Sequence, residues 1–140
     1  MTFKKMIQEA TFQRLRANWD QQQPLKGTDG EIDFIPICKL FNPCGAATWL
    51  LTECDEDGLA FGLCDLGFGT PELGYVSLDE LAEIKMLGGA VGIEQDVTFV
   101  PTQSLSQYAA EARRQGRIRH QPTISLQASK AARCNQSHRN

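Results

Sequence analysis

The 140-residue sequence predicts one α+β domain, in which a small antiparallel sheet of four to five strands is joined by an N-terminal, a mid-chain and a C-terminal helix. Apolar residues at spacings of three and four near the start and towards the end of the chain are typical of amphipathic helices. Short apolar runs between turn sequences in the middle of the chain are typical of antiparallel strands. Helices and strands do not alternate, which argues against a parallel βαβ sheet.

The first helix is predicted at residues 2–19. Its apolar stripe consists of Phe3, Ile7, Ala10, Phe12, Leu15 and Trp19. The sequence "DQQQPLKGTDGEID", residues 20–33, is predicted to be a loop, because Pro24, Gly27 and Gly30 interrupt a polar stretch.

The sheet is predicted from four apolar runs. They are residues 34–41, 46–54, 59–67 and about 73–76. The sequence "DEDG", residues 55–58, is a turn signal between two of these runs, so it predicts a hairpin. Because side chains alternate along a strand, Leu59, Phe61 and Leu63 are expected on one face of the third run.

Three further elements complete the predicted domain. In "SLDELAEIKML" the N-cap is expected at Ser77, with Glu80 completing a capping box. Its predicted buried stripe is Leu78, Leu81, Ile84 and Leu87. A strand at about 96–100 and a last helix ending at Gly116 follow. Residues 1–118 are therefore expected to form a single domain, and residues 119–140 a basic, mobile tail.

Charge is distributed unevenly along the chain. Residues 28–100 carry fourteen acidic and two basic side chains, a net charge of −12, whereas the segments before and after carry +3 and +6. An acidic surface attracts a basic partner and accelerates its association. We therefore expect a basic protein or nucleoprotein complex as the partner, with direct nucleic-acid binding less favoured. The sequence has no long apolar run and no secretory signal, so we expect a cytoplasmic protein with no membrane contact.

The usual signatures of catalysis and of cofactor binding are missing from the sequence. The glycine-rich stretch "GFGTPELG" lacks the Gly-Lys-Ser/Thr of a phosphate-binding loop, so its glycines are expected to serve turn geometry. Both histidines, His120 and His138, fall in the predicted tail, away from a nucleophile. The cysteine spacings do not fit a structural zinc site. No catalytic residue, metal or cofactor is therefore expected.

Four blocks of the sequence are characteristic when they are taken together. They are "ATWLLTE" (47–53), "AFGLCDLGFGTPELGYVSLDEL" (60–81), "GIEQDVTFVP" (92–101) and "LSQYAAEARRQGRI" (105–118). In these blocks, over roughly residues 34–118, the chain resembles the uncharacterised bacterial family called domain of unknown function 2958. The resemblance implies an accessory protein carried on a plasmid, a conjugative element or a phage, and it implies no catalytic residues.

The acidic middle segment and the resemblance together favour a non-catalytic accessory protein that binds a host or element protein. Inhibition of a nucleic-acid-based defence complex, such as a restriction or CRISPR complex, is the expected effect. The predicted partner-binding residues are Glu53, Asp55, Glu56, Asp57, Asp65, Phe68 and Glu72. Phe68 is included because a turn tip between two glycines often exposes its aromatic ring, whereas Trp49, Phe61, Leu73 and Tyr75 are expected in the core.

Two alternative functions remain open on the sequence alone. The first is a nucleic-acid-binding accessory protein that contacts phosphates through Arg113, Arg114, Arg117 and Arg119. The second, less favoured, is a metal-dependent enzyme built on the numerous carboxylates.

Overall fold

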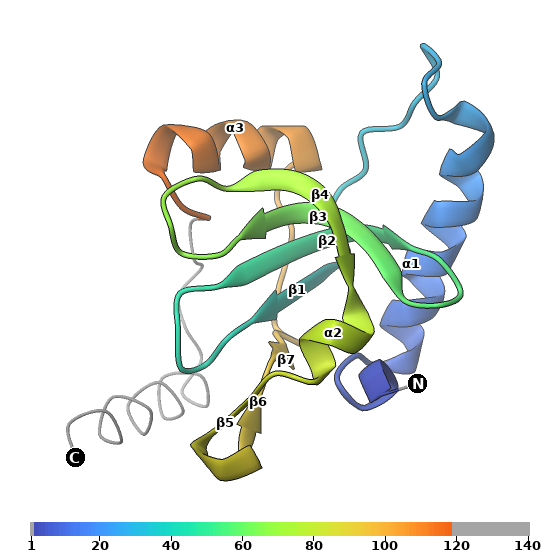
Figure 1. Cartoon of the computed structure of the whole chain (residues 1–140). Coiled ribbons are helices and arrows are strands. Elements are labelled where there is room, and N and C mark those ends of the chain that lie inside the picture. The colour runs from blue at the N-terminus through green and yellow to red at the C-terminus, as the bar shows by residue number, and fades with distance from the viewer. Residues whose placement is uncertain (1, 119–140) are drawn as a thin grey trace.

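The computed structural model describes residues 2–118 and confirms the α+β architecture (Figure 1). The helices are α1 (Glu9–Gln22), α2 (Leu78–Ala82) and α3 (Leu105–Gln115), with 3₁₀ turns at Thr2–Lys5, Gln23–Leu25 and Leu87–Gly89. The strands are β1 (Cys38–Phe41), β2 (Thr48–Cys54), β3 (Leu59–Asp65), β4 (Glu72–Ser77), β5 (Lys85–Met86), β6 (Val91–Gly92) and β7 (Glu94–Gln95). The predicted tail, residues 119–140, lies outside the described residues.

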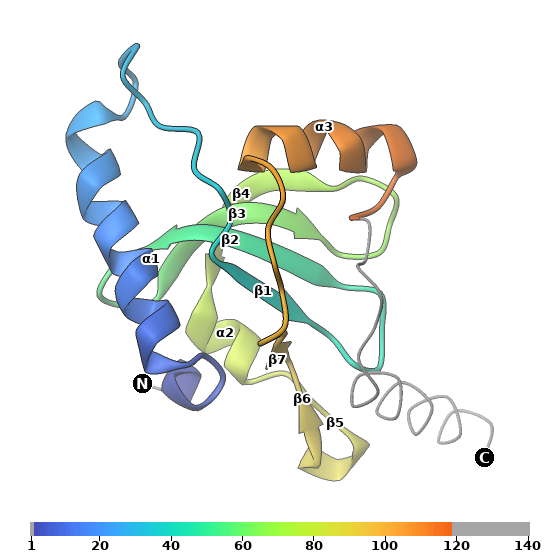
Figure 2. The same ribbon diagram turned by 180° about the vertical axis from the view of Figure 1, so that it is seen from behind.

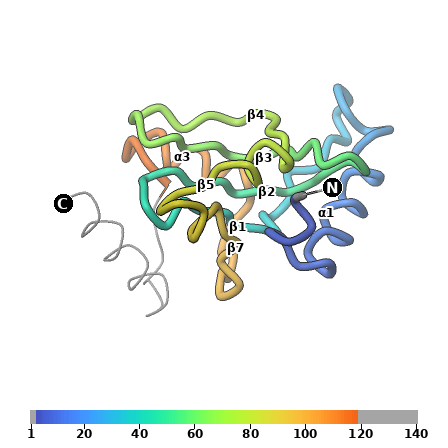
Figure 3. The backbone as a smooth tube through the Cα atoms, turned by 60° about the horizontal axis from the view of Figure 1, so that its bottom comes forward, coloured from blue at the N-terminus to red at the C-terminus, as the bar shows by residue number. Residues whose placement is uncertain are grey.

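A five-stranded antiparallel sheet organises the domain. Its strand order is β4-β3-β2-β1-β7, and Figure 3 shows this order from the β4 edge to the β7 edge. Strands β5 and β6 form a separate two-stranded hairpin. Strand β4 is an edge strand, so one side of its backbone is left without a neighbouring strand among residues 2–118.

Alternation of side chains gives the sheet an apolar layer on each face. One layer joins the sheet to α1 and α2 and includes Phe12, Leu15, Trp49, Leu51, Cys54, Ala60, Leu78 and Leu81. The other joins it to α3 and consists of Leu50, Leu63, Leu105, Ala109, Ala112 and Ile118. The segment between α1 and β1 passes from the first helix towards the sheet on the side of α3 (Figure 2).

The predicted β2–β3 hairpin is confirmed, and Asp55 holds its turn. The Asp55 Oδ1 atom accepts hydrogen bonds from the backbone N–H groups of Asp57 (2.9 Å) and Leu59 (2.8 Å). Gly58 adopts a φ of 91°, which a residue with a Cβ atom rarely tolerates. The turn sequence "DEDG" is therefore explained by local geometry.

A β-bulge interrupts β2, and Gly62 of β3 accommodates it. Leu51 pairs with Gly62, but the next pair is Glu53 with Phe61, so β2 contains one extra residue at this point. A Cβ atom on Gly62 would lie 2.0 Å from the carbonyl oxygen of Leu50. Only glycine permits such a close backbone approach, and the bulge changes the face towards which the following side chains point.

The glycines of the β3–β4 turn serve backbone geometry, as the sequence predicted. Gly67 and Gly69 have φ values of 90° and 84°. Between them, the side chain of Phe68 is 82% exposed, which confirms its predicted position at a turn tip.

The N-terminal helix is shorter than predicted. The first turn is a 3₁₀ turn, and Gln8 is extended with φ −62° and ψ 142°, so α1 begins only at Glu9. The side-chain carbonyl of Gln95 accepts the backbone N–H of Gln8 at 2.9 Å, which fixes the break against β7. Phe3 and Ile7 still belong to the core, as their spacing indicated.

The middle helix starts where the sequence predicts and ends earlier. Ser77 is the N-cap and its hydroxyl accepts the Glu80 backbone N–H, but α2 stops at Ala82. Leu87 and the two glycines after it have positive φ values of 53°, 68° and 96°, which reverse the chain into the β5–β6 hairpin. Ile84 and Leu87 are consequently exposed instead of buried.

The strand predicted at 96–100 is wrong, whereas the last helix is confirmed. The strand of this region is β7, and after it the Asp96 carboxylate accepts the Thr98 backbone N–H (3.0 Å) and turns the chain. Helix α3 is capped by Ser104 and ends at Gly116, with a φ of 74°. Within residues 2–118, none of the helices has the length and apolar character needed to cross a membrane.

Candidate functional site

The seven predicted partner-binding residues lie at the two ends of β3, and two of them are buried. The β2–β3 turn and the β3–β4 turn lie at opposite ends of β3, a strand of seven residues. At a rise of about 3.3 Å per residue, the two turns are separated by roughly 20 Å. Asp55, Glu56 and Asp57 lie at one end, while Phe68 and Glu72 lie at the other. The members of the predicted set that are not buried therefore lie in two groups, one at each end of β3.

Glu53 and Asp65 are buried instead of exposed, each with 3% of its surface accessible. The Asp65 carboxylate accepts the backbone N–H groups of Gly67 (2.9 Å) and Ile118 (2.9 Å). It therefore ties the end of β3 to the segment after α3. This is a structural role, because both oxygen atoms are engaged within the domain. Glu53 is buried because the β-bulge in β2 shifts the register of the strand and turns this side chain into the domain.

The acidic β2–β3 turn is compensated by α1. Arg16 lies 3.6 Å from Glu56 and 3.2 Å from Asp20, and its guanidinium also donates to the carbonyl of Cys54 at 3.0 Å. Asp55 uses its carboxylate in the turn itself, while Asp57 is exposed. This turn therefore offers a partner less uncompensated charge than the sequence indicated.

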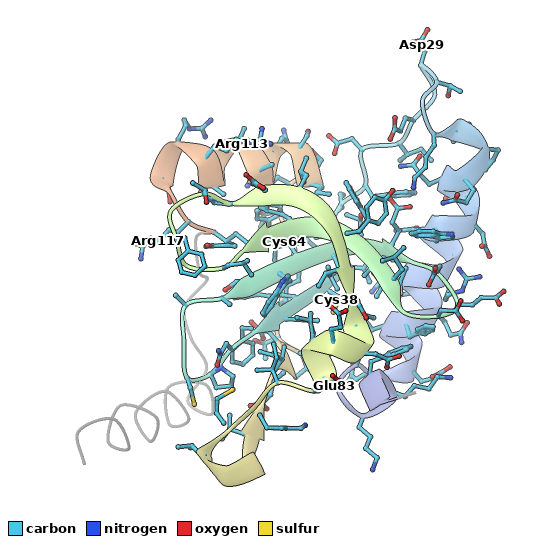
Figure 4. The ribbon with its side chains drawn as sticks, viewed as in Figure 1. Asp29, Cys38, Cys64, Glu83, Arg113 and Arg117 are labelled. Carbon is cyan, nitrogen blue, oxygen red and sulfur yellow. The ribbon has the colours of Figure 1, made fainter. Side chains whose placement is uncertain are left out.

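The arginines in the last turn of α3 and just after it lie away from that turn. Arg113, Arg114 and Arg117 are not buried, and Figure 4 shows Arg113 and Arg117 at the end of the molecule where the β3–β4 turn lies. Arg113 and Glu72 line the same depression of the surface. The fourth predicted arginine, Arg119, lies outside the described residues.

A pocket of about 430 Å³ opens between the sheet, the segment after α1 and the start of α3. Its charged lining residues are Lys26, Glu31, Asp33 and Glu53, and its aromatic ones are Phe34, Phe61 and Tyr75. The tip of the segment after α1, marked by Asp29 in Figure 4, projects beyond the sheet. The pocket brings together side chains that are far apart in sequence.

The bulge in β2 places Glu53 in this pocket. After the bulge, Glu53 pairs with Phe61, and Phe61 pairs with Tyr75, so the three residues form a row across β2, β3 and β4. The rings of Phe61 and Tyr75 pack in a tilted arrangement with their centroids 5.0 Å apart. Without the extra residue, Glu53 would point to the opposite face, with Trp49 and Leu51.

The carboxylate of Glu53 is buried without a full set of partners. Its Oε2 atom has no hydrogen-bond partner within residues 2–118. Burial raises the pKa of Glu53, the nearby ammonium of Lys26 opposes this shift, and the carboxylate of Glu31 adds to it. A buried acceptor without a donor normally costs about 1–3 kcal/mol, and more when it is charged.

Lys26 occupies an aromatic corner of the pocket. Its Nζ atom lies 4.9 Å from the ring centroid of Trp19 and 4.9 Å from that of Tyr75, and it donates a hydrogen bond to the Tyr75 hydroxyl. Trp19 meets Tyr75 edge to face, with centroids 6.3 Å apart. Such contacts hold a cation through the negative faces of the rings.

Hydrogen bonds fix the elements that carry these side chains. The buried amide of Gln22 donates to the Ile32 carbonyl (2.8 Å) and accepts its N–H (2.9 Å), which holds the segment after α1 in place. Asn18 donates to the carbonyl of Thr52 in the bulge (2.9 Å). The pocket is therefore preformed, since both its rim and its base are tied to α1.

Asp33 links the rim of the pocket to the start of α3. Its carboxylate accepts the backbone N–H of Ser106 at 3.0 Å and the Ser106 hydroxyl. Slight desolvation acts to raise the pKa of Asp33, but the hydrogen bonds from Ser106 and Ser104 outweigh it and lower that pKa. Its position near the first turn of α3 also suits a negative charge.

The arrangement is suited to binding an organic cation. Three carboxylates, one ammonium and several aromatic rings line the same pocket. Among residues 2–118, no group of three or more His, Cys, Asp or Glu side chains is placed to hold a metal ion.

Sequence reasoning missed most of this site. Tyr75 and Leu73 were expected in the core, but they are 51% and 39% exposed at the mouth of the pocket. Trp19, Lys26 and the other rim residues carried no functional prediction. One signal was present: an acidic residue, Glu53, at the end of the apolar run "TWLLTEC".

The fold and the site define a small α+β protein with a preformed acidic and aromatic pocket on one face of its sheet. The chain belongs to the family described as Protein of unknown function (DUF2958), whose model matches residues 6–119. No curated protein and no solved structure matches the chain. The match confirms the family resemblance that the sequence blocks indicated.

Proposed function

We propose that the chain is a non-catalytic protein that binds a partner protein by holding one of its basic side chains in the pocket. The single observation that carries this proposal is the buried carboxylate of Glu53, whose Oε2 atom lacks a donor among residues 2–118. A cationic side chain would supply that donor and the missing charge. A carboxyl group in a cleft whose pKa is raised by burial is a candidate for a functional site.

The surroundings of the pocket favour a macromolecular partner. Leu73 and Tyr75 expose apolar surface beside its mouth on the edge strand β4. Aromatic residues at the centre of an interface, next to a desolvated charge, are typical of the residues that dominate binding energy. The acidic character of residues 28–100 would attract a basic partner over longer distances.

The biological setting that we propose follows from the family resemblance. The protein would act in the cytoplasm as an accessory protein of a plasmid, a conjugative element or a phage. Its partner would be a basic protein or nucleoprotein complex, and binding would inhibit a nucleic-acid-based defence complex such as a restriction or CRISPR complex. This setting rests on analogy with other small acidic proteins of such elements.

Affinity capture with matched variants tests the proposal. The tagged full chain is used at moderate salt as wild type, as Glu53→Gln and as the control Glu56→Gln. We expect a basic protein that is retained by the wild type and by the control but lost with Glu53→Gln. Retention of every captured protein by Glu53→Gln would refute the proposed site.

A second candidate function is nucleic-acid binding through α3. The observation that favours it is the exposure of Arg113 and Arg114 in the last turn of that helix, with Arg117 following directly after its end. Replacing these three arginines with glutamate would then abolish a salt-dependent gel shift with DNA or RNA. A gel shift that persists in this variant would exclude this surface.

A further inference from the structure

We propose that Lys26 is an internal placeholder and that the side chain bound in the pocket is an arginine, whose guanidinium displaces the Lys26 ammonium. This inference rests on the proposed function and specifies its ligand and its regulation. It is carried by the contacts of Lys26, by the position of Glu53 and by the size of the pocket.

The Lys26 ammonium occupies the aromatic corner of the pocket but does not bond to the Oε2 atom of Glu53. The ammonium contacts the rings of Trp19 and Tyr75 and the Tyr75 hydroxyl. It influences Glu53 through space, but it supplies no hydrogen bond to the Oε2 atom of that residue. The resident cation therefore leaves the Oε2 atom of Glu53 without a donor among residues 2–118.

A guanidinium matches the pocket better than an ammonium does. An ammonium is a compact, strongly hydrated charge, whereas a guanidinium is planar, weakly hydrated and carries five N–H donors in a fixed plane. It can stack on an aromatic face while it donates two parallel hydrogen bonds to a carboxylate. The row of Tyr75 on β4, Phe61 on β3 and Glu53 on β2 offers two rings and a carboxylate across three neighbouring strands.

The size of the pocket limits its occupant to one side chain and forces an exchange of cations. A volume of about 430 Å³ lies at the lower end of the range of about 300–1,000 Å³ found for ligand pockets. It accommodates one long side chain and not a folded element. Two cations on the same pair of rings would repel each other strongly at such short range, so entry of the guanidinium requires that Lys26 leaves.

The departure of Lys26 is structurally simple. Lys26 is half-buried and follows a 3₁₀ turn on the rim of the pocket. Rotation of its side chain therefore takes the ammonium to solvent. The backbone N–H of Lys26 remains bonded to the Gln22 carbonyl at 3.1 Å, and Gln22 holds the rim. The aromatic corner therefore stays intact when the ammonium moves.

The direct test is a titration with defined probes, followed by NMR on the full chain. The probes are N-acetyl-arginine-N-methylamide, the lysine analogue, and the citrulline analogue as an uncharged isostere of arginine. Lysine labelled with ¹³C reports on the Cε of Lys26, whose signal is assigned from the Lys26→Met variant. We expect the arginine probe to move the Lys26 signal to the position of an exposed lysine, and the citrulline probe to leave it unchanged.

Variants separate displacement from simple attraction. Lys26→Met removes the competitor and is expected to bind the arginine probe at least tenfold more tightly than the wild type. The control Lys5→Met removes an exposed lysine outside the pocket and is expected to bind as the wild type does. Equal affinity of Lys26→Met and wild type, or a Lys26 signal that does not move when the probe binds, would overturn the inference.

The two proposals fail in different ways. If Glu53→Gln loses its partner while Lys26→Met binds that partner no better than the wild type, the placeholder role is refuted and the proposed function stands. If Glu53→Gln retains every partner, the proposed function is refuted, although the probe titration still decides whether the pocket binds a guanidinium.

Discussion

Replacement of Glu53 by glutamine is expected to stabilise the free protein at neutral pH. Most substitutions of buried residues destabilise a protein, so a gain in stability would point specifically to an unsatisfied charge at this position. Glu53 is 3% exposed and its Oε2 atom lacks a donor within residues 2–118. Glutamine has almost the same shape and removes the buried charge.

The size and the pH dependence of this effect follow from the burial of the carboxylate. A buried, unsatisfied polar group costs about 1–3 kcal/mol, and the amide of glutamine leaves part of that cost in place, so we expect a gain of about 1–2 kcal/mol at pH 7. The folded-state pKa of Glu53 is raised above its ordinary value of 4.5. Because folding favours the protonated carboxyl, the contribution of Glu53 to the free energy of unfolding is fully present below pH 4.5. This contribution is lost as the pH rises through the folded-state pKa. The gain from Glu53→Gln is thus present at neutral pH and small near pH 4.

The assay is equilibrium unfolding in urea at pH 7.5 and at pH 4, with the free energy of unfolding compared between variants. Urea is used because guanidinium chloride contains the proposed ligand group. The control is Glu56→Gln, which removes an exposed carboxylate paired with Arg16 and is expected to change stability by less than about 0.5 kcal/mol. A loss of stability in Glu53→Gln at pH 7.5 would refute the view of Glu53 as an unsatisfied binding group.

Three further substitutions test the framework that positions the pocket. Gly62→Ala is expected to lower the free energy of unfolding, measured in urea, by about 3 kcal/mol or more. The reason is that the new Cβ atom would lie 2.0 Å from a backbone carbonyl oxygen. A change below about 1 kcal/mol would show that the bulge relaxes. Asp65→Ala is expected to lose about 2–3 kcal/mol in the same assay, since two backbone N–H groups lose their acceptor; wild-type stability would contradict its structural role. Asp33→Ala is expected to lose less than about 1 kcal/mol at pH 7 through its bonds with Ser106, because solvent weakens the contribution of these exposed bonds. Because the pKa of Asp33 is lowered from 3.8, this difference should shrink as the pH falls below that value; a difference independent of pH would show that charge is not involved.

The parts of the fold that local chemistry specifies were predictable from the sequence. The "DEDG" turn, the N-cap at Ser77 and the end of α3 at Gly116 each depend on a few neighbouring residues, and each is found in the structure. The element bounds shift where a distant contact intervenes. The break before α1, for example, is held by Gln95, a residue that lies 87 positions away from Gln8 in sequence.

The pocket depends on a register shift that the composition of the strands does not reveal. A count of charges along the chain treats every carboxylate as exposed. In the structure, the bulge turns Glu53 into the domain, and hydrogen bonds from backbone N–H groups hold the buried Asp65 carboxylate. The aromatic corner joins Trp19 and Tyr75, whose proximity arises only from the packing of α1 against the end of the sheet. The acidic segment was identified correctly from the sequence, whereas the surface that it forms required the three-dimensional arrangement.

The most direct test of a cation site built on Glu53 is the titration of its carboxyl by NMR. Protein labelled with ¹³C-glutamate gives a Cδ signal that Glu53→Gln assigns, and its midpoint is measured with and without N-acetyl-arginine-N-methylamide. We predict a midpoint above 4.5 in the free protein and a clear decrease when the arginine probe is bound. A midpoint that the probe leaves unchanged, at probe concentrations that saturate any binding, would contradict such a site.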